Sequence, residues 1–195
     1  MITTQQVTLA CWIIFVLYWF MSARSVKPIQ ETRGWLGGNW YPILYLIVFL
    51  FMINVRFLGR LGIPTNKLAT LLLPHTTVLD LIIVILLIAG LIIAIAARRT
   101  LARNWSGAVA LKEDHELITT GPYQYVRHPI YTGMLLMILG TALSVATLGA
   151  SIGFFIIVVG ILLKLRQEEA LLTKHFVQGY LSYEKCTRTL IPFIW

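Results

Sequence analysis

Polar side chains able to bind a charged ligand gather in two segments of the C-terminal half of the chain. The first runs from His115 to Tyr131 and combines a carboxylate, histidines, tyrosines and an arginine, and the second runs from Lys164 to Glu169. Ionisable groups near a bilayer boundary are costly unless they are paired or solvated, so their concentration favours a functional site. The stretch between the two segments is apolar and long enough for two membrane passes, which would return both segments to one face.

The composition indicates an integral membrane protein. Of the 195 residues, 58% are hydrophobic and 12% are charged, whereas soluble domains carry roughly 25% charged residues. The net charge of +8 falls between apolar runs, which favours loops held at an anionic cytoplasmic leaflet over nucleic-acid binding. Neither Cys11 nor Cys186 has the spacing of a metal or redox site, and no metal site is expected. Because no clear cleavage site follows the first apolar run, we expect that run to remain as a membrane helix.

About five crossings are expected, since a helix needs about 20 residues to span the hydrocarbon core. The first three runs are Val7–Met21, extended at its start by the preceding residues, then Tyr41–Phe57 and Val78–Ala97. The last two crossings lie between Arg127 and Lys164, with turn-forming residues near the middle. The fold class is therefore predicted to be all-α and polytopic.

The last two helices are expected to form a tight hairpin that turns within Ser144–Ser151, and glycines would allow close helix contact. These glycines are Gly133, Gly140, Gly153 and Gly160. Beyond the hairpin, Lys164–Tyr183 is interpreted as one helix that continues into the cytosol. The chain then divides into residues 1–97, which hold the first three helices, and residues 98–195, which hold the polar segments.

The orientation follows from the distribution of Lys and Arg. The loop from Arg98 to Arg127 and the segment from Lys164 onward carry five Lys and Arg each, which predicts that both face the cytosol. The first loop carries three and falls on the same side, whereas the second loop also carries three but falls outside. The second loop is therefore at odds with the positive-inside rule.

Each polar residue also has a purely structural interpretation. Arg127 and His128 suit cationic anchors before a membrane helix, and Pro129 suits the first helical turn. Glu168 and Glu169 suit a solvated helix end. The combination of the two segments at a hairpin's spacing is what favours a shared site.

That combination resembles the isoprenylcysteine carboxyl methyltransferase family, within a wider set of membrane phospholipid methyltransferases. The resemblance covers roughly residues 98–195. It rests on His115–Ile118, Thr119–Tyr123, Arg127–Gly133, the pair Glu168-Glu169, Tyr180–Tyr183 and Leu190–Ile194.

The resemblance implies S-adenosyl-L-methionine as cofactor, with S-adenosyl-L-homocysteine as product, in a site between the cytosolic loop and the C-terminal helix. The acceptor implied is the carboxylate of a prenylated cysteine or a similar lipophilic acid entering from the bilayer. The cofactor-binding residues implied are His115, Glu116, Leu117, Ile118, Gly121, Tyr123, His128, Pro129, Ile130, Tyr131 and Glu168. The catalytic residues expected are Arg127, Lys164, Arg166 and Glu168; Lys164 stands where family members often have Arg, whose planar fork it cannot reproduce.

Three alternatives remain open at the level of sequence. A phospholipid amine acceptor would suit the same architecture and would favour a base such as Glu168 or Glu169. A membrane sterol reductase would use NADPH, although no basic cluster is clearly devoted to a 2′-phosphate. A transporter or scaffold would place polar groups near the bilayer midplane, where Asn54 and Asp80 are the candidates.

Overall fold

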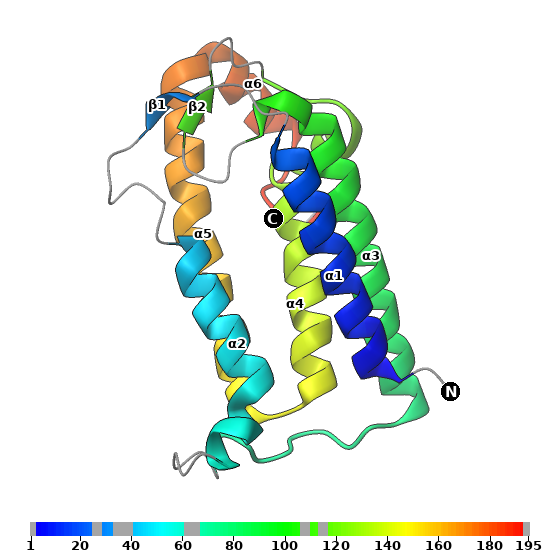
Figure 1. Ribbon diagram of the computed structural model, residues 1–195. Coiled ribbons are helices and arrows are strands. Elements are labelled where there is room, and N and C mark those ends of the chain that lie inside the picture. The colour runs from blue at the N-terminus through cyan, green and yellow to red at the C-terminus, as the bar shows by residue number, and fades with distance from the viewer. Residues whose placement is uncertain are drawn as a thin grey trace.

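The computed structural model describes residues 3–24, 29–32, 41–60, 67–105, 110–112 and 117–192. Figure 1 shows the helices and strands, which form a helical bundle. They are α1 (Thr4–Ala23), β1 (Ile29–Thr32), α2 (Tyr41–Arg60), α3 (Thr77–Leu101), η2 (Ala102–Asn104), β2 (Ala110–Lys112), η3 (Gly121–Gln124), α4 (Pro129–Val145), α5 (Leu148–Phe176) and α6 (Gln178–Cys186).

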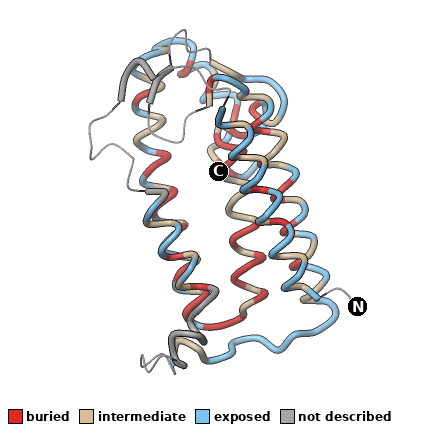
Figure 2. The backbone as a smooth tube through the Cα atoms, viewed as in Figure 1, coloured by how far each residue is buried: buried red, intermediate tan, exposed pale blue. Residues whose placement is uncertain are grey.

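Long apolar helices make up the bundle, as the sequence predicts for a polytopic membrane protein. Three segments of the described chain are long and apolar enough to cross a bilayer: Thr4–Ala23, Thr77–Asn104 and Leu148–Phe176. Two shorter apolar segments, Ile43–Met52 and Pro129–Val145, lie in α2 and α4. Much of α1 is exposed along its length, whereas α4 is largely buried (Figure 2). The expected polytopic membrane architecture is therefore confirmed, with three of the five apolar helices in the described chain long enough for a full span.

The helices alternate in direction, which brings several segments to a common end of the bundle. Here α1, α3 and α5 end and α2 and α4 begin, with α6 across them (Figure 1). We call it the site end. The other end holds the turn between α4 and α5 and the loop before α3. Strands β1 and β2 pair antiparallel between the two loops at the site end, a small sheet that the all-α prediction did not include.

The closest helix crossing joins α3 to α4 through facing glycines. A Cβ added to Gly133 would lie 2.5 Å from the Gly90 carbonyl oxygen and 2.7 Å from the Ala94 nitrogen. Side chains of Ile83, Leu87 and Met137 are fully buried around this crossing. The two backbones therefore touch, as small residues permit in membrane helices.

The remaining hairpin glycines also serve contacts outside the hairpin. Gly153 and Gly160 on α5 face Met52 and Tyr45 of α2, and Gly140 on α4 faces Leu87 of α3. The four glycines thus allow close helix contacts, as expected. These contacts join α4 to α3 and α5 to α2, and they do not join the two arms of the hairpin to each other.

The turn of the hairpin lies within the predicted interval. Ala146 adopts a left-handed conformation with φ 51°, and the Thr147 hydroxyl then accepts from the Ala150 amide to cap α5. The loop before α3 is fixed to this turn, because the Leu72 amide donates to the Ala146 carbonyl at 2.8 Å and the Gly149 amide donates to Leu68 at 2.9 Å.

The helix predicted over Lys164–Tyr183 is divided in two, which corrects that interpretation. Helix α5 ends at Phe176 and α6 begins at Gln178, with Val177 at φ 36° between them. A β-branched residue is strained in this region, and the change of direction lets α6 cross the site end. The packing of α6 outweighs the helical continuity that the local sequence favours.

Candidate functional site

The start of α4 is fixed to the C-terminal tail by backbone hydrogen bonds. Val126 pairs with Arg188 in a parallel bridge. The Arg127 amide donates to the Arg188 carbonyl at 2.7 Å, and the His128 amide donates to the Thr189 carbonyl at 3.1 Å. Pro129 follows at the first helical position, where its missing N–H costs nothing. The residues that precede α4 are therefore held between the bundle and the tail.

Arg127 connects the tail to α5. Its Nε donates to Glu169 at 2.8 Å, its Nη1 donates to the Thr187 carbonyl at 3.1 Å, and its Nη2 donates to the Thr189 hydroxyl at 2.9 Å. A carboxylate oxygen of Glu184 lies 3.6 Å from Nη2. Burial alone lowers the pKa of the guanidinium, but the hydrogen bond and charge of Glu169 outweigh it and raise that pKa. Arg127 is therefore a permanent cation committed to protein groups.

Glu169 holds two neighbours through one oxygen. The atom that accepts from Arg127 also lies 3.2 Å from His128 Nε2, and the His128 side chain is 6% exposed. This shared contact fixes the imidazole ring between α4 and α5. It also leaves Glu169 with two partners that favour its ionised form.

Glu168 is the centre of a second set of contacts. The Tyr131 hydroxyl donates to its Oε1 at 2.7 Å, Lys164 Nζ lies 3.8 Å from the same oxygen, and His128 Nδ1 lies 3.8 Å from Oε2. The Lys164 ammonium also sits 5.6 Å from the Tyr131 ring centroid. Three side chains, from the start of α4 and from α5, thus meet at the Glu168 carboxylate.

The helical period of α5 decides which of its polar residues join this cluster. Lys164 and Glu168 are four residues apart and share a face, whereas Arg166 is rotated about 200° from Lys164. Lys164 is 5% exposed, but Arg166 faces outward. The structure therefore places Arg166 away from the cluster that its neighbours form.

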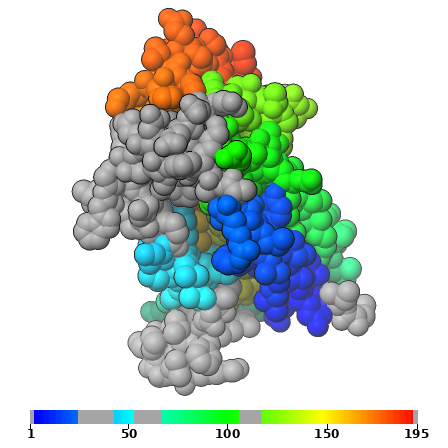
Figure 3. Space-filling view, turned by 45° about the horizontal axis from the view of Figure 1, so that its top comes forward, coloured from blue at the N-terminus to red at the C-terminus, as the bar shows by residue number. Residues whose placement is uncertain are grey.

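Helix α6 covers a second part of the proposed cofactor region. The Tyr183 hydroxyl donates to the Tyr123 carbonyl at 2.6 Å. Burial raises the pKa of the Tyr183 phenol despite the opposing charge of Arg127, so the phenol keeps its proton. Tyr123 in η3 packs with Ala97 and Ile130 in an apolar cluster that Ile118 joins. Figure 3 shows the orange and red C-terminal segment beside the lime-green segment around η3.

The residues assigned by the family resemblance thus fall into two neighbouring groups. The polar group contains Arg127, His128, Tyr131, Lys164 and Glu168, and the apolar group contains Ile118, Tyr123 and Ile130.

Three of the remaining assigned residues lie near these groups. Pro129 is buried at the start of α4. Gly121 has φ 60° and rests against Thr100, and a Cβ on Gly179 would meet Leu117 at 3.8 Å. His115 and Glu116 lie outside the described residues.

The tail contacts were not part of the predicted site. Glu169 belongs to the Glu-Glu motif, so the sequence indicated that this residue could take part in the site. No motif indicated Glu184, Thr187 or Thr189, because their contacts depend on the position of α6 across the site end.

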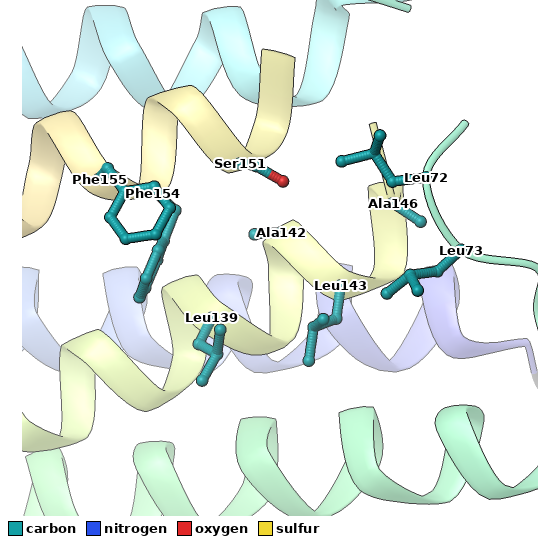
Figure 4. Close-up of a pocket in the computed structure, with 9 residues that line it drawn as sticks. All are labelled: Leu72, Leu73, Leu139, Ala142, Leu143, Ala146, Ser151, Phe154 and Phe155. Carbon is teal, nitrogen blue, oxygen red and sulfur yellow. The ribbon is translucent and has the colours of Figure 1, made fainter. Parts of the chain in front are cut away.

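Two hollows lie at the other end of the bundle. One of about 170 Å³ is lined by leucines of the loop before α3 and by side chains of α4 and α5, including Ala142, Ser151 and Phe154 (Figure 4). The other, of about 640 Å³, is lined by residues of α1 and α3 and includes His75 and Asp80, whose side chains are 3.0 Å apart. Neither adjoins the polar cluster.

Comparison with known proteins identifies the family of the region that contains the cluster. The model of the isoprenylcysteine carboxyl methyltransferase (ICMT) family matches residues 81–174. This region belongs to the ICMT family. The match confirms the resemblance inferred from the motifs, and it begins earlier in the chain, within α3.

Individual relatives of the ICMT family extend the similarity. The protein-S-isoprenylcysteine O-methyltransferase of Saccharomyces cerevisiae is 34% identical over 169 residues, which are 85% of this chain and 66% of the relative. The protein-S-isoprenylcysteine O-methyltransferase A of Arabidopsis thaliana is 30% identical over 113 residues, which are 56% of this chain and 57% of the relative. The chain therefore spans less than two thirds of the length of these curated relatives.

A solved structure shares the fold of the whole chain. It is the structure of a eukaryotic intramembrane Ras methyltransferase, ICMT, which matches with a TM-score of 0.63 and 21% identity over 98% of this chain and 68% of that chain. The likeness includes the first helices, for which the motifs gave no indication, and it supports an integral membrane fold.

Proposed function

We propose that this chain is an S-adenosylmethionine-dependent membrane methyltransferase that esterifies the carboxylate of a prenylated cysteine or a similar lipophilic acid. The observation that carries the proposal is the convergence of His128, Tyr131 and Lys164 on Glu168 at one end of the α4–α5 hairpin. These are residues that the family resemblance assigns to the cofactor and the acceptor, and they come from two segments far apart in the sequence.

The side chains of the polar cluster fit S-adenosylmethionine. The Glu168 side chain is 20% exposed, and a carboxylate suits the ribose hydroxyls or the ammonium of this molecule. His128 suits its polar groups, and the face of Tyr131 suits a cationic centre. When bound, the cofactor supplies a methyl group on a positively charged sulfur.

An acidic acceptor needs orientation more than proton transfer. A carboxylate is already ionised at neutral pH, so the residues of the site have only to align it and exclude water. Lys164, buried beside Tyr131, is the cation suited to hold it. Glu169 is already engaged by Arg127 and His128, which makes it poorly suited to act as the free base that an amine acceptor would favour.

The same proposal assigns roles to the two parts of the chain. Residues 1–97 would form a membrane frame, and residues 98–195 would bind cofactor and acceptor. The site end would face the cytosol, because most Lys and Arg of the chain lie in the loops and tail there. The acceptor would then arrive from the bilayer and the cofactor from water.

The test is calorimetric titration of the purified protein in detergent with S-adenosylhomocysteine, with NADPH as control ligand. Saturable binding that is lost in Glu168→Gln but kept in Lys174→Gln, an exposed position on the same helix, supports the proposal. Methyl transfer is then compared between a farnesylated thiol acid and a phospholipid amine. Absence of binding by folded protein, or transfer to the amine alone, contradicts the proposal.

A further inference from the structure

Arg98 is a buried cation at the site end that the proposed mechanism does not use. It occupies the last turn of α3 with only 2% of its surface exposed. Its Nη1 donates to the Ala102 carbonyl at 2.6 Å, and its Nη2 donates to the Ser22 carbonyl at 2.6 Å. The guanidinium also lies over the Trp105 ring, 4.6 Å from the centroid. One side chain thus joins the ends of α1 and α3 to the segment that follows them.

The two carbonyls explain how the charge is tolerated. Ser22 lies in the last turn of α1, and Ala102 directly follows α3. The final carbonyls of a helix lack partners within it and form the negative end of its dipole. Among the described residues, no carboxylate forms an ion pair with Arg98, so two helix ends take the place of a counter-ion.

Arg98 also fixes a strained turn. Ala102 has φ 46°, a left-handed conformation that residues with a Cβ rarely adopt. Its carbonyl is the group that Arg98 holds. This turn sends the chain from α3 through η2 to Trp105, and its direction therefore depends on the guanidinium.

Contacts lead from Trp105 to the apolar wall of the proposed cofactor region. Trp105 packs against the cluster of Ala97, Tyr123 and Ile130, which Ile118 also joins. Tyr123 in turn receives the Tyr183 hydrogen bond from α6. The guanidinium, the indole and the wall form one continuous stack.

We propose that Arg98 is a positioning residue for cofactor binding, which it supports by holding Trp105 and the turn at Ala102 against the wall that contains Ile118 and Tyr123. The inference rests on the proposed function, because it assigns that wall to the cofactor. Arg98 itself would touch neither the cofactor nor the acceptor. Its planar fork with two donating nitrogens is what the arrangement requires, and a lysine cannot supply it.

The experiment compares Arg98→Lys and Arg98→Gln with Arg99→Gln, an exposed arginine on the same turn. Titration with S-adenosylhomocysteine gives affinity and stoichiometry separately. The loss of a charge-assisted hydrogen bond typically changes an equilibrium constant by roughly tenfold. We expect Kd to rise by roughly this factor in both Arg98 variants, at unchanged stoichiometry, and to stay at the wild-type value in Arg99→Gln.

Hydrogen exchange of the ligand-free protein gives a second readout. The peptide covering residues 117–125 should exchange faster in Arg98→Lys than in the wild type, while the middle of α4 remains protected. Lower stoichiometry at unchanged Kd would mean that Arg98 only maintains the fold and would overturn the inference, as would unchanged exchange of this peptide. A wild-type protein that binds no S-adenosylhomocysteine overturns the proposed function and with it the role of the wall.

Discussion

The contact between Gly133 and Gly90 makes a quantitative prediction about stability. In Gly133→Ala the new methyl would lie 2.5 Å from the Gly90 oxygen, 2.7 Å from the Ala94 nitrogen and 2.9 Å from the Ala94 Cβ. Carbon contacts are most favourable at about 3.5–4.0 Å. Because two of these atoms belong to the backbone and the third to a Cβ, none can move aside by a rotamer change, and α3 and α4 must separate by roughly 1 Å.

The cost follows from two opposing effects. Overpacking of this kind costs about 1–3 kcal/mol, and replacing glycine by alanine inside a helix returns about 1 kcal/mol. Because the atoms in the way are mainly backbone atoms, we expect the upper half of the overpacking range, about 2–3 kcal/mol. The net loss is then about 1–2 kcal/mol, which corresponds to a fall of roughly 2–8 °C in the unfolding midpoint. Gly179→Ala is the control, because its Cβ would meet only the Leu117 side chain at 3.8 Å, and it should leave the midpoint unchanged or raise it.

Buried Cys11 on α1 provides the assay. Its thiol becomes reactive when the helices separate, whereas Cys186 is exposed in the folded state. A thiol-reactive fluorophore in a Cys186→Ser background therefore reports unfolding in detergent as temperature rises. A Gly133→Ala midpoint equal to or above that of the parent would refute the close approach of α3 and α4.

Three further predictions concern single contacts. Arg127→Lys should release the C-terminal tail, since an ammonium cannot reach all the acceptors of the guanidinium. Residues 184–190 should then exchange their amide hydrogens faster than in the wild type, while the amides of the long helices exchange at the wild-type rate. Tyr131→Phe removes the 2.7 Å hydrogen bond to Glu168 and should weaken S-adenosylhomocysteine binding roughly tenfold or more, with equal affinity counting against the cluster. Thr141→Val removes the acceptor of the Trp12 indole N–H at 3.0 Å and should cost about 1–3 kcal/mol of stability without changing ligand affinity, because Thr141 lies about 15 Å along α4 from the cluster; a change in affinity would contradict this separation.

The sequence predicts local features of this protein well and contacts between distant segments poorly. The apolar runs locate the membrane helices, and Pro129 marks the start of α4, because hydropathy and proline geometry act within a few residues. The break at Val177 has no such marker, since neither proline nor glycine occupies that position. Its cause is the packing of α6.

The site shows the same division. The spacing of Lys164 and Glu168 places both on one helical face, and the motif containing Tyr131 indicates its partner. The commitment of Arg127 to the tail and the burial of Arg98 could not be predicted, because both depend on carbonyls supplied by other segments. From the sequence alone, Arg98 is an ordinary charge at the end of a membrane helix.

The backbone pairing of the tail with the residues before α4 has a consequence for biosynthesis. The amides of Arg127 and His128 receive their partners only when Arg188 and Thr189 have been made, and the Thr132 hydroxyl likewise waits for the Leu190 carbonyl. Residues 188–190 follow all five long helices in the chain and are therefore synthesised after them. The start of α4 lacks these partners until synthesis has passed α6, so completion of this part of the site is a late step of biosynthesis.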